Sequence, residues 1–320
     1  MPLFSPRKSF TQPTSEVVFP VSKSRKKQSA KVFYNDRDEL ALTWIGQQYG
    51  ICLDHLQFLL GELPGFGAQY DEWISEGAAR AVVTRWKNAG WVQASCLRVK
   101  EPFWVWLTHR GLSKVGLPYG DLDLTLSDMV HLRHWYAINA IRLHVADGEE
   151  NIKWISERQL VHGVVHRKGK RLLHRPDAEM HYTDGDIIAI EAELSSKKPF
   201  MLAEILMELL HGKEYLRLKA EYGWKSAREK SYESRSKYTQ VWYFAPPPVR
   251  QLIYRVRAKF IKRGYLSEQD AERLVVHWYP LAQTDEEVEQ EERENRQARL
   301  DPTLLADGDD SLIDDEDDSL

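Results

Sequence analysis

Apolar runs of strand length alternate with amphipathic stretches of helix length between residues 125 and 283. Four runs are rich in β-branched and aromatic residues, and they predict strands at residues 151–155, 187–193, 239–244 and 274–279. A fifth segment, residues 174–182, leads through a turn into the second of them, as a hairpin does. Amphipathic helices are expected at residues 126–145, 200–222 and 249–263. This order (helix, three strands, helix, strand) predicts a mixed α/β domain over residues 125–283.

Three carboxylates occupy the expected hairpin. Asp177 follows a proline, and Glu191 and Glu193 come fourteen and sixteen residues later. Because side chains alternate along a strand, Glu191 and Glu193 point to one face, and Asp177 would lie across the strand pair from them. Three carboxylates at a half-buried strand end are costly unless a cation neutralises them, and hard oxygen ligands suit Mg²⁺ or Mn²⁺. We therefore predict a metal site for phosphodiester hydrolysis.

The same order of elements and carboxylates is that of restriction-endonuclease-like cores, the PD-(D/E)XK nucleases, with one departure. The superfamily pattern has a lysine where this chain has Glu193. Three alternatives stay open. In the first, Glu193 itself orients the attacking water, as in some active members of the superfamily. In the second, Lys197 or Lys198 reaches back into the site. In the third, the site is degenerate. Glu157, near the end of the first strand, is expected to support the metal ligands.

Residues 37–120 have a different pattern, in which three helices precede a strand pair and a short helix. The third helix is expected at residues 77–88 with Ser75 as its N-cap, and it places Val82 and Trp86 inward. Strands are expected at residues 91–99 and 103–107, and Thr108 would cap a helix that runs to about Gly116. Three helices, a β-hairpin and a closing helix are the topology of a winged-helix DNA-binding domain.

Exposed basic residues supply candidate contacts to double-stranded DNA. The third helix would enter the major groove with Arg80, Thr84, Arg85 and Lys87. In the second domain, the candidates lie at an expected hairpin tip and beside Asp177: Arg167, Lys168, Lys170, Arg171 and Arg175. These side chains would bind substrate phosphates.

Both ends of the chain differ in charge from the rest. Residues 1–36 have seven Lys or Arg against two acidic residues, and they predict a disordered arm that adds non-specific DNA affinity or is merely solvated. Residues 284–320 predict a disordered acidic tail, with 16 acidic residues and three arginines from Asp285 on. Without this tail, residues 1–284 have 41 basic and 32 acidic residues, a net charge of about +9. The tail would compete with DNA for this basic body or keep the chain in solution.

Several further patterns bear on location and chemistry. No run of about 18 apolar residues predicts a membrane helix, and the N-terminus has no apolar signal region. Cys52 and Cys96 lie in apolar stretches, which favours buried, reduced thiols in a cytoplasmic protein. Zinc binding by His162 with His166, or by His131 with His134, rests on spacing alone, and histidines that are hydrogen-bonded within the fold or solvated are expected instead. A relaxase with a tyrosine nucleophile would need a His-apolar-His strand, which we do not find.

The chain resembles the replication-relaxation family, whose members combine an N-terminal winged helix with a nuclease-like core. The resemblance covers residues 38–245, and it rests on Thr108-His109-Arg110-Gly111, His131, Asn139, Trp154 with Glu157, Arg175-Pro176-Asp177-Ala178 and Ile190-Glu191-Ala192-Glu193. It implies a role in the replication, transfer or transposition of a plasmid or other mobile element, and relaxation of DNA.

Two functions of different classes follow from these patterns. One is a magnesium-dependent DNA endonuclease or nickase. The other is an inactive DNA-binding replication or transcription regulator, whose core serves as a platform for dimerisation or for holding DNA. The change from lysine to Glu193 favours the second. A homodimer would suit paired half-sites, and a replication or transposition partner could be required for activity.

Overall fold

The structure is a computed structural model that describes residues 33–63, 73–96, 103–120, 129–146, 151–162, 173–231, 235–281 and 285–300. The described residues from Tyr34 onward belong to one compact unit of mixed α/β structure. The basic arm expected at residues 1–36 lies outside the described residues up to residue 32. Within the described ranges, no helix is long and apolar enough to cross a membrane.

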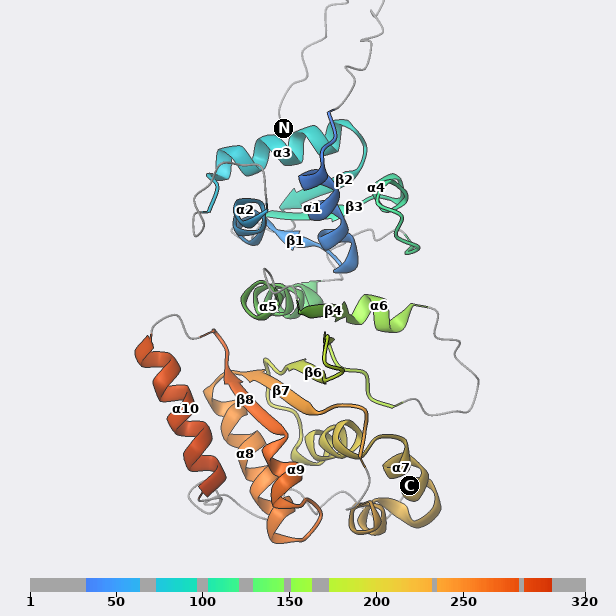
Figure 1. The fold of residues 1–320 in the computed structure, drawn as a ribbon, viewed down its shortest axis with the longest axis vertical. Helices are drawn as coiled ribbons and strands as arrows, with labels where there is room; N and C mark the ends of the chain where they lie inside the picture. The colour runs from blue at the N-terminus through green and yellow to red at the C-terminus, as the bar shows by residue number, and fades with distance from the viewer. Residues whose placement is uncertain are drawn as a thin grey trace, which may run out of the picture. The chain divides into compact units, whose positions relative to one another are not determined.

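The N-terminal part of this unit combines four helices with a small antiparallel sheet (Figure 1). The helices are α1 (Asp36–Gln47), α2 (Leu53–Glu62), α3 (Glu76–Asn88) and α4 (His109–Lys114). The strands β1 (Ile51–Cys52), β2 (Val92–Cys96) and β3 (Phe103–Leu107) lie in the order β1-β3-β2. Ser75 and Thr108 cap α3 and α4 through their hydroxyls, as predicted. The two-residue strand β1 was not predicted, because so short a run has no periodicity.

Buried aromatic and aliphatic side chains form the core of this part. Trp86 of α3 is fully buried, and Val82 and Val83, four and three residues before it, are also buried. On α1, Leu42, Trp44 and Ile45 are buried, whereas Leu40 is half exposed. Cys52 is buried as predicted, whereas the prediction for Cys96 was wrong because its side chain is exposed.

The second sheet has five strands in the order β4-β5-β6-β7-β8. They are β4 (Ile152–Ser156), β5 (Ala178–Tyr182), β6 (Ile187–Ala192), β7 (Gln240–Ala245) and β8 (Leu274–Trp278). The pairs β4–β5 and β5–β6 are antiparallel, and β6–β7 and β7–β8 are parallel. The predicted hairpin is therefore β5 and β6. The strand expected to end near Glu157 ends at Ser156, and Glu157 opens the short helix α6 (Glu157–Val161).

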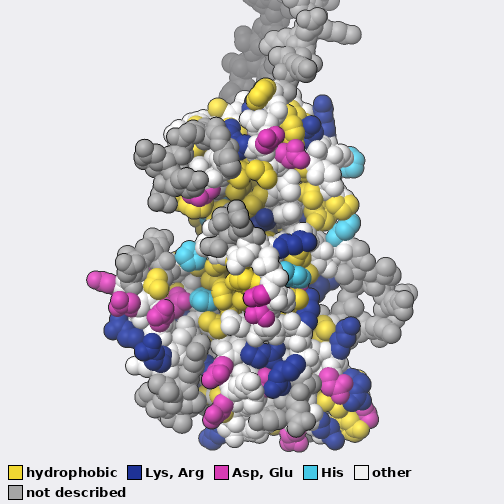
Figure 2. Space-filling model, in the orientation of Figure 1, with side chains coloured by type: hydrophobic (Ala, Val, Ile, Leu, Met, Phe, Trp, Pro, Cys, Tyr) yellow, Lys and Arg dark blue, Asp and Glu magenta, His cyan; other side chains and the backbone are white. Residues whose placement is uncertain are grey.

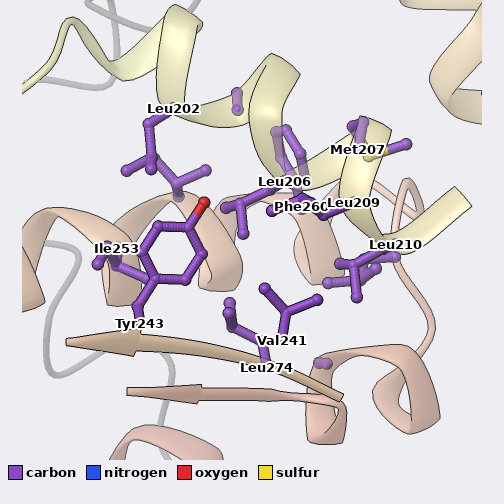
Figure 3. Packing of buried hydrophobic residues seen from close by; sticks show 14 of the residues in the cluster. Leu202, Leu206, Met207, Leu209, Leu210, Val241, Tyr243, Ile253, Phe260 and Leu274 are labelled. Carbon is purple, nitrogen blue, oxygen red and sulfur yellow. The ribbon is translucent and has the colours of Figure 1, made fainter. Parts of the chain in front are cut away.

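Helices cover both faces of this sheet. The helix α5 (Met129–Val145) packs Ala137, Ile138 and Ile141 against alternate residues of β5 and β6. The opposite face carries α7 (Pro199–Lys230) and α8 (Pro247–Lys262). Figure 3 shows leucines of α7 and Ile253 of α8 over Val241 and Tyr243 of β7. Alternate positions on β6 thus face different helices, and Glu191 points to the face that carries α7, together with Ala189.

The helix α7 is longer than expected, and the chain turns within it at two glycines. Gly212 and Gly223 have φ angles of 68° and 78°, in the left-handed region that only glycine enters without strain. Another short helix, α9 (Glu268–Glu272), precedes β8 and was not predicted, because one turn gives no helical period.

The predicted disorder of residues 284–320 was wrong for residues 285–300, which form helix α10 (Asp285–Leu300) beside β8 (Figure 1). The physical reason is the open edge of the sheet at β8, whose backbone groups need partners. Glu291 Oε2 accepts from the Trp278 backbone N–H at 3.0 Å, and Asn295 Nδ2 donates to the Val276 carbonyl at 2.9 Å. Glu294 also pairs with Arg250 at 3.1 Å. Residues 301–320 lie outside the described residues.

Candidate functional site

Asp177 lies just before β5 and joins three elements. Its Oδ2 accepts from the Ala192 backbone N–H of β6 at 2.8 Å, and its Oδ1 lies 2.9 Å from Nε2 of His134 on α5. Its backbone carbonyl accepts from the N–H of Glu157 at 2.9 Å. The carboxylate is therefore held in place by β6 and by α5.

Glu191 is the register neighbour of Asp177. Ala178 pairs with Ile190 in the antiparallel ladder, so the next pair outward is Asp177 with Glu191. Glu191 is 4% exposed, and its Oε1 lies 2.8 Å from Nε2 of His174. Burial and the charge of Asp177 raise the pKa of Glu191 to about 7, although His174 opposes the shift. The charge of Asp177 thus disfavours ionisation of the buried Glu191 carboxyl.

Glu193 follows the end of β6 and forms an ion pair with Lys197, four residues on. Burial alone would lower the pKa of Lys197, but its hydrogen bond to Glu193 and the charges of Glu191 and Asp177 raise it. Lys197 is therefore paired with Glu193 and lies close enough to Glu191 and Asp177 for their charges to act on it. Lys198, the other candidate lysine, is exposed at the N-cap of α7.

Glu157 completes the group of acids. Burial and the charge of Asp177 raise the pKa of the Glu157 carboxyl, while His134 and Arg175 oppose the shift. The hydroxyl of Tyr49 is a hydrogen-bond partner of this carboxylate. Asp177 thus lies close enough to Glu157, Glu191 and Lys197 for its charge to act on each of them, and Lys197 is paired with Glu193.

Sequence analysis missed the two histidines of this site. His134 was considered only as a zinc ligand, and it bonds Asp177 across 43 residues of sequence. His174 stands three residues before Asp177, and its backbone N–H also donates to Glu208 Oε2 of α7 at 2.8 Å. Burial lowers the pKa of both imidazoles, but the facing carboxylates outweigh it and raise the pKa of each. The nearness of His174 to Asp177 in the sequence was the one available signal.

Two polar atoms near these acids lack hydrogen-bond partners among the described residues. They are the hydroxyl of Tyr243, which is 1% exposed, and Nη1 of Arg175. Tyr243 pairs with Glu191 in the β6–β7 ladder, and burial and the charges of Glu191, Glu193 and Asp177 raise its pKa well above the usual value. Buried polar atoms are nearly always satisfied, so atoms like these mark places where a ligand or water binds.

The donor set fits a hard dication only in part. In the described ranges, no three His, Cys, Asp or Glu side chains are grouped as a metal site. Each predicted ligand instead has a protein partner: His134 for Asp177, His174 for Glu191 and Lys197 for Glu193. However, Mg²⁺ often takes only one or two carboxylates and fills its other positions with waters and phosphate oxygens. Asp177 and Glu191 supply such a pair, and Tyr243 and Arg175 supply unsatisfied donors beside it.

The predicted DNA contacts on α3 differ in their exposure and in their partners within the chain. Lys87 is exposed, and Arg80 is exposed and paired with Glu76 at 2.6 Å. Thr84 donates its hydroxyl to the Arg80 carbonyl. The outward placement of Arg85 was wrong, because its guanidinium makes two 2.6 Å hydrogen bonds to the buried carboxylate of Asp38.

Arg167, Lys168, Lys170 and Arg171 lie outside the described residues. On the face seen in Figure 2, the basic side chains of the described residues are interspersed with acidic ones.

Comparisons with known proteins identify no relative of this chain. A scan against protein-family models and searches of curated proteins and of solved structures find no match to this chain.

Proposed function

We propose that the protein binds double-stranded DNA and hydrolyses its phosphodiester bonds with a divalent metal, as an endonuclease or nickase of a plasmid or other mobile element. The observation that carries this proposal is the pairing of Asp177 with the buried Glu191 at one sheet end, with Lys197 beside them. The order α5, β4, α6, β5, β6, α7, β7 supports it, since apart from the short helix α6 it is the order expected of a nuclease core. The three helices and antiparallel strands of the N-terminal part support a winged-helix domain.

In this proposal, Asp177 and Glu191 hold Mg²⁺ or Mn²⁺. The bound ion supplies a water of lowered pKa and neutralises charge on the phosphate. Arg175 binds a phosphate oxygen through its unsatisfied Nη1. Lys197 replaces the lysine that the nuclease pattern has at position 193, and its ion pair with Glu193 keeps its ammonium near the other carboxylates. Without the metal, His134 and His174 would be the partners of the Asp177 and Glu191 carboxylates.

One observation favours the alternative, an inactive DNA-binding regulator. Each predicted ligand already has a hydrogen-bonded or charged partner within the chain, so the fold does not require a metal for neutralisation. In that case the sheet end is a structural polar network, and the core serves as a platform for DNA or for a second copy.

A supercoiled-plasmid assay with Mg²⁺ or Mn²⁺ separates the two functions. We expect the wild-type chain to nick or linearise the plasmid, and Asp177→Asn and Glu191→Gln to lower the rate at least about 100-fold. Asp186→Asn, at the exposed turn of the same hairpin, is the matched control and should cut normally. Cleavage that survives in Asp177→Asn would refute the catalytic assignment, and DNA binding without cleavage by the wild type would support the regulator.

A further inference from the structure

The short helix α6 lies between the candidate site and the end of α1. Its N-cap, Ser156, is fully buried and donates its hydroxyl to the backbone carbonyl of Gln47 at 2.5 Å. Gln159 closes a capping box with Ser156, so the local fold of α6 depends on this residue. A helix of five residues is not stable alone, and its order therefore depends on such contacts.

Arg158, the second residue of α6, binds the carboxyl end of α1. Its Nη1 donates to the carbonyls of Gly46 and Gln48, both at 3.0 Å, and its Nη2 donates to the Gly120 carbonyl at 2.9 Å. The last carbonyls of a helix have no partner within the helix, and a cation there is favoured by the helix dipole. Arg158 thus caps α1 from another part of the chain.

Glu157, between these two residues, lies close enough to Asp177 for the two charges to interact. Its backbone N–H bonds the carbonyl of Asp177. From the N-terminal part, Tyr49 reaches the Glu157 carboxylate with its hydroxyl and stacks on Trp135 with a ring separation of 4.8 Å. Three consecutive residues therefore join α1 to the backbone of a predicted metal ligand.

The other end of α1 is attached to α3. Asp38, in the first turn of α1, is fully buried and accepts two hydrogen bonds from Arg85 and one from the Trp86 indole at 2.9 Å. A helix of twelve residues is a rigid rod of about 18 Å. It is therefore fixed to the candidate DNA-reading helix at one end and to α6 at the other.

We propose that Ser156 and Arg158 are positioning residues that couple α3 to the candidate site through α1. This inference rests on the proposed function. DNA that fixes α3 fixes α1, and α1 holds α6 so that Glu157 and Asp177 keep the geometry needed for cleavage. The bound DNA thereby shifts α6 toward its ordered position, and the site acts on DNA that the N-terminal part has bound.

The two parts of the unit are also joined elsewhere, which provides a control. Asn139 Nδ2 donates to the Gly50 carbonyl at 2.7 Å, and Arg142 Nη2 donates to Gln47 Oε1 at 2.9 Å. Both residues belong to α5, and neither adjoins Glu157 in the chain. Arg142→Lys therefore weakens the same junction without loosening α6, and it is the matched control for Arg158→Lys.

Hydrogen exchange on the full chain tests the coupling, with Ser156→Ala as a second variant if Arg158→Lys folds poorly. We expect the Glu157 and Ala192 amides to exchange at least about tenfold faster in Arg158→Lys than in the wild type or in Arg142→Lys. Added duplex DNA should slow these amides in the wild type and in Arg142→Lys but not in Arg158→Lys. DNA affinity should stay within about twofold in both variants, while the nicking rate falls about tenfold in Arg158→Lys alone.

The outcomes separate the two proposals. If the wild type binds DNA without cutting it, hydrolysis fails, and the exchange data alone decide the coupling. Equal exchange in Arg158→Lys and Arg142→Lys, or no DNA effect on the wild-type amides, would overturn the coupling even where cleavage is observed. If the wild type binds no DNA, both proposals fail.

Discussion

Glu191 is a buried acid that remains easier to protonate in the folded chain than in the unfolded one. Its pKa is raised to about 7 by burial and by Asp177. The folded state therefore binds an extra proton between the ordinary glutamate pKa and pH 7, and stability falls as pH rises through that window. The raised pKa values of His134 and His174 act in the same direction.

Glu191→Gln removes this titration. The melting temperature of the variant should therefore increase relative to that of the wild type as pH rises from 5 to 8. A difference of a few degrees is expected, since about 1 kcal/mol moves the melting temperature of a chain this size by roughly 2–4 °C. Calorimetry across this pH range measures it, with the exposed Glu229→Gln as the control. Parallel curves for Glu191→Gln and the wild type would show that the carboxyl is not perturbed.

Among the elements, α3 combines a surface role with a structural one. Lys87 is exposed, whereas Arg85 neutralises the buried Asp38. Burial alone would raise the pKa of Asp38, but the hydrogen bonds from Arg85 and Trp86 lower it. The two neighbouring cations of this helix should therefore respond differently to removal.

Lys87→Ala should weaken DNA binding and lower the salt slope of the binding constant by about one, with little change in stability.

Arg85→Ala should lower the free energy of unfolding by about 2–3 kcal/mol, because Asp38 is left buried without its cation. Urea denaturation and binding titrations at several salt concentrations measure both effects. If the Arg85→Ala variant is stable and the salt slope of its DNA-binding constant is reduced, Arg85 is a DNA contact instead.

How well an element could be predicted depended on how local its cause was. The strand at residues 103–107 and the caps at Ser75 and Thr108 follow from nearby residues, and they were predicted. The helix α10 has no apolar period, and only its contacts with Arg250, His277 and the β8 edge explain its order. The one-turn helices α6 and α9 have too few residues to show a pattern.

The site follows the same rule. The pairing of Asp177 with Glu191 comes from the hairpin register, and the ion pair of Glu193 with Lys197 from a four-residue spacing. The contact of His134 with Asp177 could not be predicted, because α5 and the hairpin are far apart in the sequence and meet only in the packed fold.

For the whole molecule, charge is distributed so that a basic body carries an acidic end. The chain has a formal net charge of −4, but residues 285–320 hold 16 of its 48 acidic residues. Part of this acidic end, α10, is packed on β8 and pairs with Arg250. In the proposed function, DNA binding by the remaining surface would be connected through α1 and α6 to chemistry at the Asp177–Glu191 pair.

The account depends most on a dication between Asp177 and Glu191, and a crystal soaked in Mn²⁺ tests this directly by anomalous diffraction. The predicted result is a peak about 2.1 Å from one carboxylate oxygen of each residue, with His134 and His174 moved off them. A map at saturating Mn²⁺ with no such peak, and with both histidines still bonded to the carboxylates, would contradict it.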